Sequence, residues 1–209
     1  MTEYHKIQTV FLRDPTDKFK SLLIGQWAKP EFDYLQNNRW MFTEKIDGTN
    51  IRVIVNDGKV SFGGRTDDAQ MPTFMMARLN ELFTGEKLAT VFPDGNAVLY
   101  GEGFGAKIQK GGGNYIKDGV AFILFDVRVG TFWLERANVS DVAQKLGIRE
   151  VPLMGFGTLH DAVKVAKAGI TSTFGPFAAE GLVMRPEIEL FARNNDRVIA
   201  KIKTRDFEE

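Results

Sequence analysis

The sequence contains no cysteine and only two histidines, His5 and His160, which lie far apart. Without cysteine it forms no disulfides and offers no thiolate metal ligands, and two distant histidines do not supply the ligand set of a zinc site. It also lacks a run of about 18 or more apolar residues, and its first residues lack a basic start followed by an apolar core. We therefore predict no membrane span and no secretory signal, and we expect a cytoplasmic protein.

An excess of either charge is also missing, because 27 Lys and Arg residues balance 27 Asp and Glu residues. A protein that binds nucleic acid without regard to sequence usually carries a basic excess, so a large nucleic-acid footprint is not indicated. A local basic cleft remains compatible with this balance. The 209 residues, 44% of them hydrophobic, suffice for one domain with a substantial core, and no repeat or low-complexity linker divides them. We predict a single domain over residues 1–209.

The stretch from Thr43 to Arg52 places a lysine at the end of a predicted strand. Apolar residues precede Lys45, and a tight Asp47-Gly48 turn follows it before a second strand begins at Ile51. A sheet holds such a side chain rigidly, so Lys45 is a candidate nucleophile. An ordinary lysine has a pKa of about 10.4 and must lose its proton before it attacks. The alternative is a hairpin with a surface lysine, and this stretch alone does not separate the two.

Hydrophobic periodicity predicts a mixture of strands and helices, an α+β fold. One predicted helix begins with Thr73 as its cap and buries Met75, Leu79, Leu82 and Phe83. Residues 1–38 have a weaker pattern and are interpreted as a partly extended lead-in. The predicted strands cover residues 39–45, 51–56, 60–62, 97–102, 120–129, 131–134, 151–157, 180–185 and 198–203, and the predicted helices cover 73–85, 140–146 and 160–168.

A glycine-rich segment follows the strand that ends at Glu102. Its first glycines suggest a phosphate-binding loop, but no Gly-Lys-Ser/Thr follows and no helical pattern begins there, so we reject that interpretation. Glycines mixed with Lys107, Lys110 and Tyr115 suit a mobile loop that approaches a phosphate backbone. A flexible surface loop without function is the alternative.

Charged residues gather at the ends of the predicted strands or within them. The carboxylates are those of Asp47, Glu102 and Glu180, and hard oxygen ligands of this kind suit Mg²⁺ or Mn²⁺. Cations at a transferring phosphoryl group stabilise the charge that develops on its oxygens. Carboxylates for a divalent metal and cations for the phosphate are together what a nucleotidyl transfer requires. The cationic members of the set are Lys45, Arg65, Lys201 and Lys203.

In order along the chain, these segments resemble the motifs of the covalent nucleotidyltransferases: ATP-dependent DNA ligases, RNA ligases and mRNA capping enzymes. The resemblance covers about four-fifths of the chain and implies the ligase-type, ATP-grasp-like fold of that superfamily, with antiparallel sheets, flanking helices and a central nucleotide cleft. Lys45 to Asn50 resembles motif I, Gly64-Arg65-Thr66 motif Ia, Tyr100-Gly101-Glu102 motif III, Phe122 to Asp126 motif IIIa, Glu180 to Arg185 motif IV, and Lys201-Ile202-Lys203 motif V.

Within the superfamily the sequence most resembles the RNA ligase 2-like branch. Thr-Glu-Lys at the nucleophile, Asn50 five residues after it, and the glycine-rich run after Glu102 carry this likeness. Asp47 is a departure, because some RNA ligases of the branch have histidine there. Only six residues follow Lys203, so we expect neither the OB-fold domain nor the C-terminal helical domain of the longer ligases.

The resemblance implies a role for each matching residue. Lys45 takes AMP from ATP as a covalent lysyl-AMP, and Lys201 and Lys203 hold the α-phosphate. The metal is organised by Asp47, Glu102 and Glu180. The implied nucleotide contacts are made by Glu44 and Phe122 to the adenine, by Arg65 to the ribose or the 5′-phosphate end, by Glu102 to the ribose, and by Asn50 through water in the metal shell.

The predicted function is that of an ATP-dependent RNA ligase that seals 5′-phosphate and 3′-hydroxyl ends and uses ATP with Mg²⁺ or Mn²⁺. Its predicted partners are nucleic acid ends, RNA in preference to DNA, met in the cytoplasm of a cell or of a phage-infected host. A minimal DNA nick ligase is the alternative enzyme, and a capping guanylyltransferase fits less well. An RNA-end-binding module with an inactive site is the alternative without catalysis.

Overall fold

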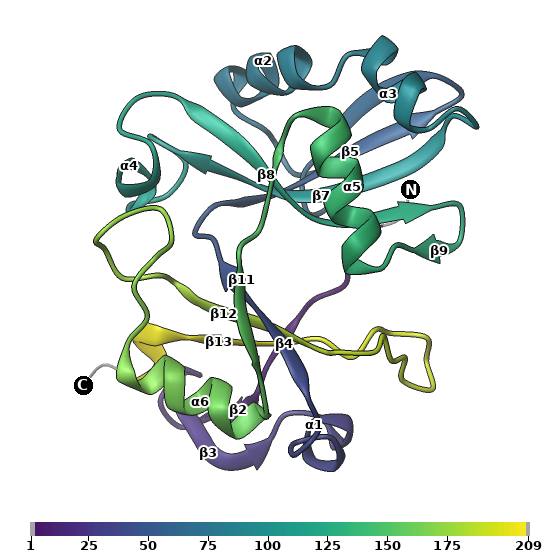
Figure 1. Ribbon diagram of the computed structural model, residues 1–209. Helices are drawn as coiled ribbons and strands as arrows, with labels where there is room; N and C mark the ends of the chain where they lie inside the picture. The colour runs from purple at the N-terminus through teal and green to yellow at the C-terminus, as the bar shows by residue number, and fades with distance from the viewer. Residues whose placement is uncertain (1–2, 208–209) are drawn as a thin grey trace. The chain divides into compact units, whose positions relative to one another are not determined.

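The computed structural model describes residues 3–207 and divides the chain into two compact units (Figure 1). Each unit is formed by two separate segments, and the chain passes from unit 2 to unit 1 between Ile46 and Asp47. Unit 1 comprises Met1–Tyr4 and Asp47–Val151, and unit 2 comprises His5–Ile46 and Pro152–Glu209.

Unit 1 is built on one six-stranded sheet in the order β10-β8-β7-β5-β6, with β9 paired to β8. Its three long strands are antiparallel neighbours, so residues two apart on each strand share a face of the sheet. Only β10 runs parallel to its partner β8. The strands are β5 (Thr49–Asn56), β6 (Lys59–Gly63), β7 (Asn96–Gly105), β8 (Val120–Val129), β9 (Phe132–Trp133) and β10 (Arg149–Glu150).

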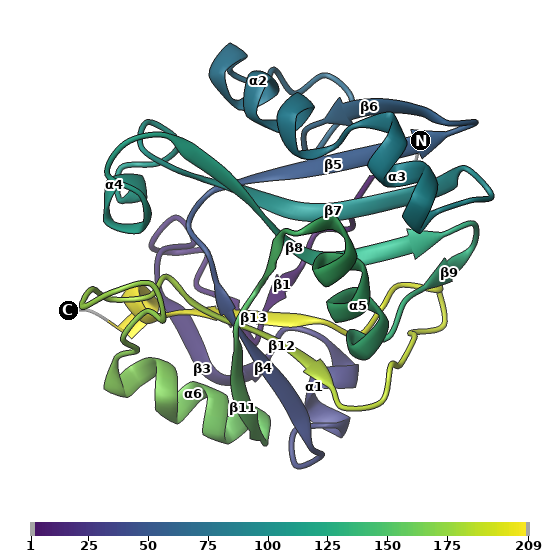
Figure 2. The same cartoon turned by 45° about the horizontal axis from the view of Figure 1, so that its top comes forward.

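One face of this sheet forms the core of unit 1 with three helices. Ile51, Leu99 and Leu124 lie on that face, fully buried against α2, α3 and α5, which Figure 2 shows beside the sheet. The opposite face carries Asn50, Glu102 and an aromatic cluster around Tyr4. The helices of unit 1 are α2 (Thr73–Leu82), α3 (Gly85–Val91), α4 (Gly112–Tyr115) and α5 (Arg136–Leu146).

Unit 2 is built on a five-stranded sheet in the order β1-β13-β12-β4-β11. Its central strand β12 is antiparallel to both neighbours, while β1 runs parallel to β13, as Figure 2 shows. A separate two-stranded sheet joins β2 and β3. The strands are β1 (Gln8–Thr9), β2 (Phe11–Arg13), β3 (Leu22–Trp27), β4 (Trp40–Lys45), β11 (Leu153–Gly157), β12 (Gly181–Pro186) and β13 (Ala200–Lys203).

The helix α6 (Leu159–Ala168) covers one face of the unit 2 sheet. Alternation along β13 buries Ala200 and Ile202 in this core and leaves Lys201 and Lys203 on the other face, half-buried. A capping box at Thr158 starts α6, and Gly169 ends it. The remaining short elements of unit 2 are α1 (Pro30–Tyr34) and the 3₁₀ helix η1 (Thr204–Phe207).

The predicted α+β class and its antiparallel sheets are confirmed, and most predicted strands are present within a few residues. Three local predictions were wrong. Thr73 is the first residue of α2 and makes no side-chain cap, because Pro72 occupies the capping position. Gly85 begins a second helix, α3, with Thr84 as its cap. The helix α5 begins at Arg136, so Ser140 lies within it and bonds to the Arg136 carbonyl.

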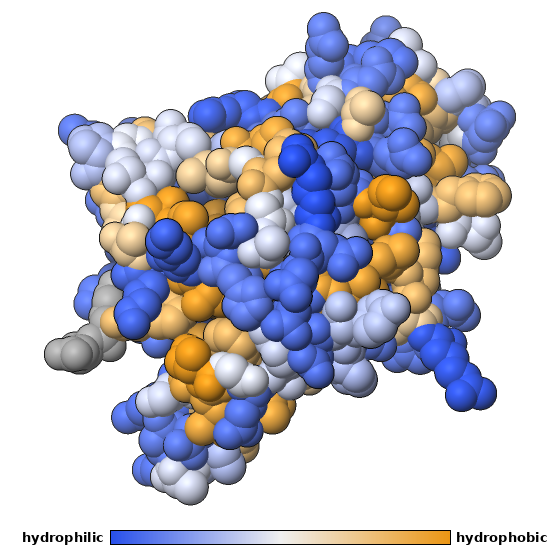
Figure 3. Space-filling view, turned by 60° about the horizontal axis from the view of Figure 1, so that its bottom comes forward, coloured by the Kyte–Doolittle hydropathy of each residue, from blue (hydrophilic) through white to orange (hydrophobic). Residues whose placement is uncertain are grey.

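The surface carries scattered exposed apolar side chains. On the face drawn in Figure 3, hydrophilic residues predominate and the hydrophobic ones form separate patches. Phe19, Ile24 and Tyr34 of unit 2 are among the exposed large side chains. Among the helices that the structure describes, none is long and apolar enough to cross a membrane.

Candidate active site

The face of the unit 2 sheet opposite α6 brings Lys45 into register with motif V. Lys45 at the end of β4 is directly opposite Gly181 on β12, and Gly181 is opposite Lys203 on β13. Neighbouring strands are about 4.8 Å apart, so the two lysines lie on one face with a single strand between them. The next row along the same face contains Lys201. The structure therefore brings together the three lysines that the sequence singled out.

A single carboxylate links two of these lysines. Glu180 Oε2 lies 2.5 Å from Lys45 Nζ, and Glu180 Oε1 lies 2.6 Å from Lys203 Nζ. The Glu180 side chain is only 11% exposed, so these ion pairs are largely shielded from water. Lys45 and Lys203 place two cations beside one carboxylate on this face, which suits a phosphate group.

The pKa of Glu180 reflects both its burial and its partners. Burial alone would raise it, but the charges and hydrogen bonds of Lys45 and Lys203 outweigh burial and hold the pKa below its ordinary value. Glu180 is therefore ionised at neutral pH. In these ion pairs Lys45 carries its proton, which it must lose to act as a nucleophile.

Gly181 has a structural reason to be glycine. Its φ of +154° belongs to a region that other residues rarely adopt, and a Cβ at this position would collide with the backbone oxygen of Ile202. A side chain here would push β12 away from β13. The register of Lys45 with Lys203 consequently depends on Gly181.

Glu44 lies on the opposite face from Lys45, because successive residues of a strand point to opposite sides. Its side chain is 1% exposed, and its two oxygens accept three hydrogen bonds. Ser172 Oγ donates at 2.6 Å, and Thr173 donates through its backbone N at 3.0 Å and its Oγ1 at 2.7 Å. In this structure Glu44 anchors the segment after α6, and its predicted contact with adenine stays a prediction. The sequence analysis did not predict this contact, because Ser172 and Thr173 lie outside every motif that it identified. Their adjacent hydroxyl groups are the only sign of it in the sequence.

In unit 1, Asn50 and Glu102 form a directly opposed pair on β5 and β7. Asn50 Oδ1 is buried and has no hydrogen-bond partner among the described residues. A buried acceptor of this kind normally has a partner, so Asn50 offers a place for a bound water or a cation. Amide and carboxylate oxygens are ligands that divalent Mg²⁺ or Mn²⁺ accepts, and the pair fits a hydrated cation. Within residues 3–207 no cluster of three Asp, Glu or His side chains is preformed for a metal. The metal ligands that the sequence suggests, Asp47, Glu102 and Glu180, stay a prediction.

The Asp47-Gly48 turn is fastened by the glycine-rich loop. The backbone N of Asp47 donates to the hydroxyl of Tyr115 at 3.2 Å, and Gln109 Nε2 donates to the Gly48 carbonyl at 3.0 Å. Tyr115 also packs its ring against Phe104. The loop contains the short helix α4, which the sequence analysis did not predict. This loop fixes the turn that follows Lys45, a role that the sequence analysis did not predict. Its approach to a phosphate backbone stays a prediction.

Two further predicted residues of unit 1 differ in exposure. Arg65 follows β6 and is exposed, and its contact with the ribose or the 5′-phosphate end stays a prediction. Phe122 is 3% exposed, packs edge-on against Phe83 at 5.1 Å between ring centroids, and lies on the helix-covered face. Since Glu102 lies on the other face, Phe122 serves the core in this structure. Its stacking on adenine stays a prediction.

The predicted site residues are thus divided between the two units. Unit 2 contains Glu44, Lys45, Glu180, Lys201 and Lys203, and unit 1 contains Asp47, Asn50, Arg65, Glu102 and Phe122.

Comparison with known proteins gives a matching family and similar solved structures. The RNA ligase family profile matches residues 38–203. Structures of an RNA ligase from Naegleria gruberi share the fold. A variant with ATP and Mn has a TM-score of 0.70 at 16% identity, over 97% of this chain and 56% of that chain. The same protein with PPi has a TM-score of 0.66 at 20% identity, over 97% and 58%.

A further variant of that ligase, with AMP and Mn, has a TM-score of 0.66 at 19% identity, over 96% of this chain and 57% of that chain. The chain therefore spans a little over half the length of these solved chains. A search of curated protein sequences gives no match.

Proposed function

Because the chain belongs to the RNA ligase family, we propose that it is an ATP-dependent RNA ligase that joins 5′-phosphate and 3′-hydroxyl ends through a lysyl-AMP intermediate. The observation that carries the proposal is the row of Lys45, Gly181 and Lys203, with Glu180 bridging the two lysines. On one face of one sheet, Lys45 provides the nucleophile and Lys203 provides a cation for the phosphate. Glu180 provides the carboxylate that pairs with both.

In the proposed first step, Lys45 Nζ attacks the α-phosphorus of ATP and pyrophosphate leaves. Lys203 and Lys201 stabilise the negative charge on the α-phosphate oxygens as the bond forms. Glu180 Oε2 contacts Lys45 Nζ and orients it, and the proton that Nζ loses on attack passes to this carboxylate or to water. The resulting phosphoramidate is cleaved in the second step, when an RNA 5′-phosphate accepts the AMP, and in the third step a 3′-hydroxyl displaces AMP.

A divalent cation fits this proposal through the oxygens of unit 1. Asn50 Oδ1 and the Glu102 carboxylate, with Asp47, would hold its water shell. Such a cation would supply positive charge for the phosphate oxygens of ATP. The structures of the Naegleria gruberi ligase with ATP, AMP and Mn support ATP and a divalent metal as cofactors here. A cytoplasmic location, and action of residues 1–209 as an adenylyltransferase domain by themselves, are also part of the proposal.

The deciding experiment is incubation with [α-³²P]ATP and Mg²⁺ or Mn²⁺, followed by denaturing electrophoresis. We expect a labelled band with the wild type and with Lys164→Ala, an exposed lysine of α6 in the same unit. We expect none with Lys45→Ala. If intact mass shows that the purified wild type is not already adenylylated and it still gains no label from ATP, the ligase proposal fails. An RNA-end-binding module would then be the better account.

The nucleic acid is tested separately, with nicked duplexes that differ at one sugar. We expect the label on Lys45 to be followed by sealing of a nick with a 3′-ribonucleotide end. Efficient sealing of only the 3′-deoxy nick would make the protein a DNA nick ligase instead. Labelling from GTP in place of ATP would identify a capping guanylyltransferase.

A further inference from the structure

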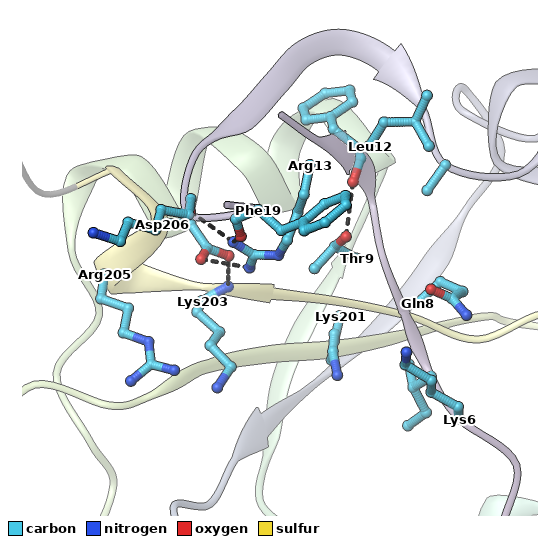
Figure 4. Close-up of a pocket in the computed structure, with 14 residues that line it drawn as sticks. Lys6, Gln8, Thr9, Leu12, Arg13, Phe19, Lys201, Lys203, Arg205 and Asp206 are labelled. Atoms are coloured by element: carbon cyan, nitrogen blue, oxygen red, sulfur yellow. Dashed lines mark hydrogen bonds and ion pairs between the residues drawn. The ribbon is translucent and has the colours of Figure 1, made fainter. Parts of the chain in front are cut away.

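A pocket of about 800 Å³ lies within unit 2, next to the two motif V lysines (Figure 4). Its walls come from the N-terminal segment, including β1 and β2, and from η1 at the end of the chain. Apart from Lys201 and Lys203, its lining residues all lie outside residues 38–203, the segment that the family profile matches. We name it the N-terminal pocket, and its main members are Lys6, Phe19, Lys20, Lys201, Lys203 and Arg205.

The N-terminal pocket is strongly basic in a protein without net charge. Its single carboxylate, Asp206, accepts from Arg13 at 2.7 Å and from the backbone N of Lys203 at 3.2 Å, so its charge is already compensated. Lys6 and Arg205 are exposed and form no ion pair with the other described residues. Figure 4 shows the side chains of Lys201, Lys203 and Arg205 on one side of β13. Lys203 is already paired with Glu180, so the positive charge that the pocket offers an anion comes mainly from the exposed Lys6 and Arg205.

The pocket is also lined by an aromatic ring, that of Phe19. Phe19 is 61% exposed, and its φ of 63° follows a φ of 64° at Lys18, a backbone that residues other than glycine rarely adopt. Hydrogen bonds fix this turn. Phe19 N donates to the Asp14 carbonyl at 2.8 Å, and Arg13 donates to the Lys20 carbonyl at 2.8 Å. Strained backbone that its surroundings hold in place is typical of functional segments.

The position of the pocket relative to Lys45 follows from the strand order. Lys45 is on β4, the motif V lysines are on β13, and the pocket continues from β13 towards β1 and β2. The pocket thus extends from the lysines that would hold the α-phosphate, on the side away from Lys45. In an in-line transfer the entering group approaches opposite the leaving group. When Lys45 is the leaving group, the entering group comes from the pocket.

We propose that the N-terminal pocket binds the 5′-phosphorylated end of a single-stranded RNA, an inference that rests on the proposed function. The terminal phosphate lies towards Lys201 and Lys203, following phosphates contact Lys6, Lys20 and Arg205, and a base stacks on Phe19. An oxygen of the 5′-phosphate forms a bond to the AMP phosphorus as the phosphorus–Nζ bond of Lys45 breaks. The electron pair stays on Nζ, which then takes up a proton.

The stacking ring distinguishes this ligand from pyrophosphate. Single-stranded nucleic acids are commonly held by a basic groove together with aromatic side chains that stack on bases, and the N-terminal pocket contains both. Pyrophosphate and the β- and γ-phosphates of ATP share the phosphate chemistry but gain nothing from Phe19. Variants at the ring and at the cations therefore separate the two ligands.

The test uses the full chain, adenylylated with [α-³²P]ATP and then freed of ATP. Transfer of AMP is followed in a single turnover to a 3′-blocked, 5′-phosphorylated RNA of about 12 nucleotides. The variants are Phe19→Ala, Phe19→Tyr and a triple variant in which Lys6, Lys20 and Arg205 become alanine. The matched controls in unit 2 are Tyr34→Ala, an aromatic residue that is 88% exposed, and Lys167→Ala, an exposed lysine.

We expect Phe19→Ala to lower transfer at subsaturating RNA about tenfold and Phe19→Tyr to restore it. The triple variant should lower transfer and make the dependence of log affinity on log salt less steep by about two. Lysyl-AMP formation should stay within about twofold of wild type in every variant, as should all activities of the two controls.

Two results would overturn the inference. If the triple variant loses lysyl-AMP formation, the pocket binds the polyphosphate of ATP. If transfer and its salt dependence are unchanged in all variants, the pocket does not bind the RNA. Should the wild type form no lysyl-AMP, the proposed function fails instead. Fluorescence anisotropy with the same RNA, 5′-phosphorylated or 5′-hydroxyl, then still decides whether the pocket binds a 5′-phosphate end.

Discussion

At the scale of single residues, Glu180 connects the chemistry of the site to its stability. One carboxylate compensates Lys45 and Lys203, and all three side chains are mostly shielded from water. Removing the carboxylate leaves two ammonium groups on one sheet face without their partner. Breaking charged hydrogen bonds of this kind costs about 1.5–3 kcal/mol. The substitution Glu180→Gln tests this role, because it keeps the size of the side chain and removes its charge.

The first prediction concerns the pH dependence of stability. The folded protein holds the pKa of Glu180 below its ordinary value of 4.5. Its ion pairs therefore stabilise the fold above that pH, and the stabilisation is lost as the pH falls through the lowered pKa. Glu180→Gln should have a lower Tm than wild type at neutral pH, and the difference should narrow between about pH 5 and about pH 3. Thermal melts across that range check it.

Other carboxylates with lowered pKa values do not affect the difference in Tm between wild type and Glu180→Gln. A hydrogen bond from Ser21 lowers the pKa of Asp17, and one from the Thr158 backbone lowers that of Asp161. Neither carboxylate bonds to Glu180, Lys45 or Lys203, and both titrate in the wild type and in the variant. A constant difference in Tm at every pH would contradict the assigned role of Glu180.

The second prediction concerns Glu44, which is fully buried with three hydrogen-bond donors from Ser172 and Thr173. Glu44→Gln should destabilise the protein by about 1.5–3 kcal/mol, because an amide replaces a charged acceptor and places an NH₂ against donors. Urea denaturation measures this loss. If the variant is as stable as wild type but binds ATP more weakly, Glu44 contacts the nucleotide, as the family resemblance implied.

At the scale of elements, the glycine-rich loop after β7 supports the turn that follows Lys45. Tyr115 contributes one hydroxyl contact to the backbone of Asp47, and Gln109 contributes one side-chain contact to Gly48. Gly112 has no room for a side chain, because a Cβ there would collide with the Gly105 carbonyl. The loop is thus packed against its own base, and this fixes where its two contacts lie.

The third prediction tests this support. Tyr115→Phe keeps the ring against Phe104 and removes only the hydroxyl that accepts from Asp47 N. We expect lysyl-AMP formation to slow about threefold to tenfold, since the lost hydrogen bond is worth about 1 kcal/mol. Tyr34→Phe, at an exposed position of α1, is the matched control. An unchanged rate in Tyr115→Phe would show that the turn needs no support from the loop.

At the scale of the whole molecule, each unit has a hydrophobic core of its own. Leu99 is fully buried in the core of unit 1, and Leu182 is fully buried in that of unit 2. Both lie on strands with a partner on each side, β7 and β12. The backbone amides of these two strands should therefore be among the slowest to exchange in their units.

The fourth prediction follows from this division. Leu99→Ala and Leu182→Ala should each destabilise the protein by about 2–5 kcal/mol, the cost of a cavity in a packed core. Native-state hydrogen exchange should show faster exchange concentrated in unit 1 for Leu99→Ala and in unit 2 for Leu182→Ala. Equal acceleration in both units for either variant would mean that the two cores unfold as one cooperative unit.

Much of the fold and of the site could be predicted from the sequence. Alternation predicted that Lys201 and Lys203 share a face, and turn residues predicted the Asp47-Gly48 bend, because both signals are local. The same local rules failed at the helix starts. Pro72 and Glu135 occupy capping positions without a side-chain cap, so the residues that normally mark a helix start were absent.

The sequence by itself determined which residue types stand at the strand ends, and through them the resemblance to RNA ligases. Only the tertiary structure decided which of these residues meet. Glu180 bonds to Lys45 across 135 residues of chain, and Ser172 bonds to Glu44 across 128. The N-terminal pocket likewise joins residues from both ends of the chain. Strand order and register produce these contacts, and they depend on how whole hydrophobic faces pack together, which no short segment encodes.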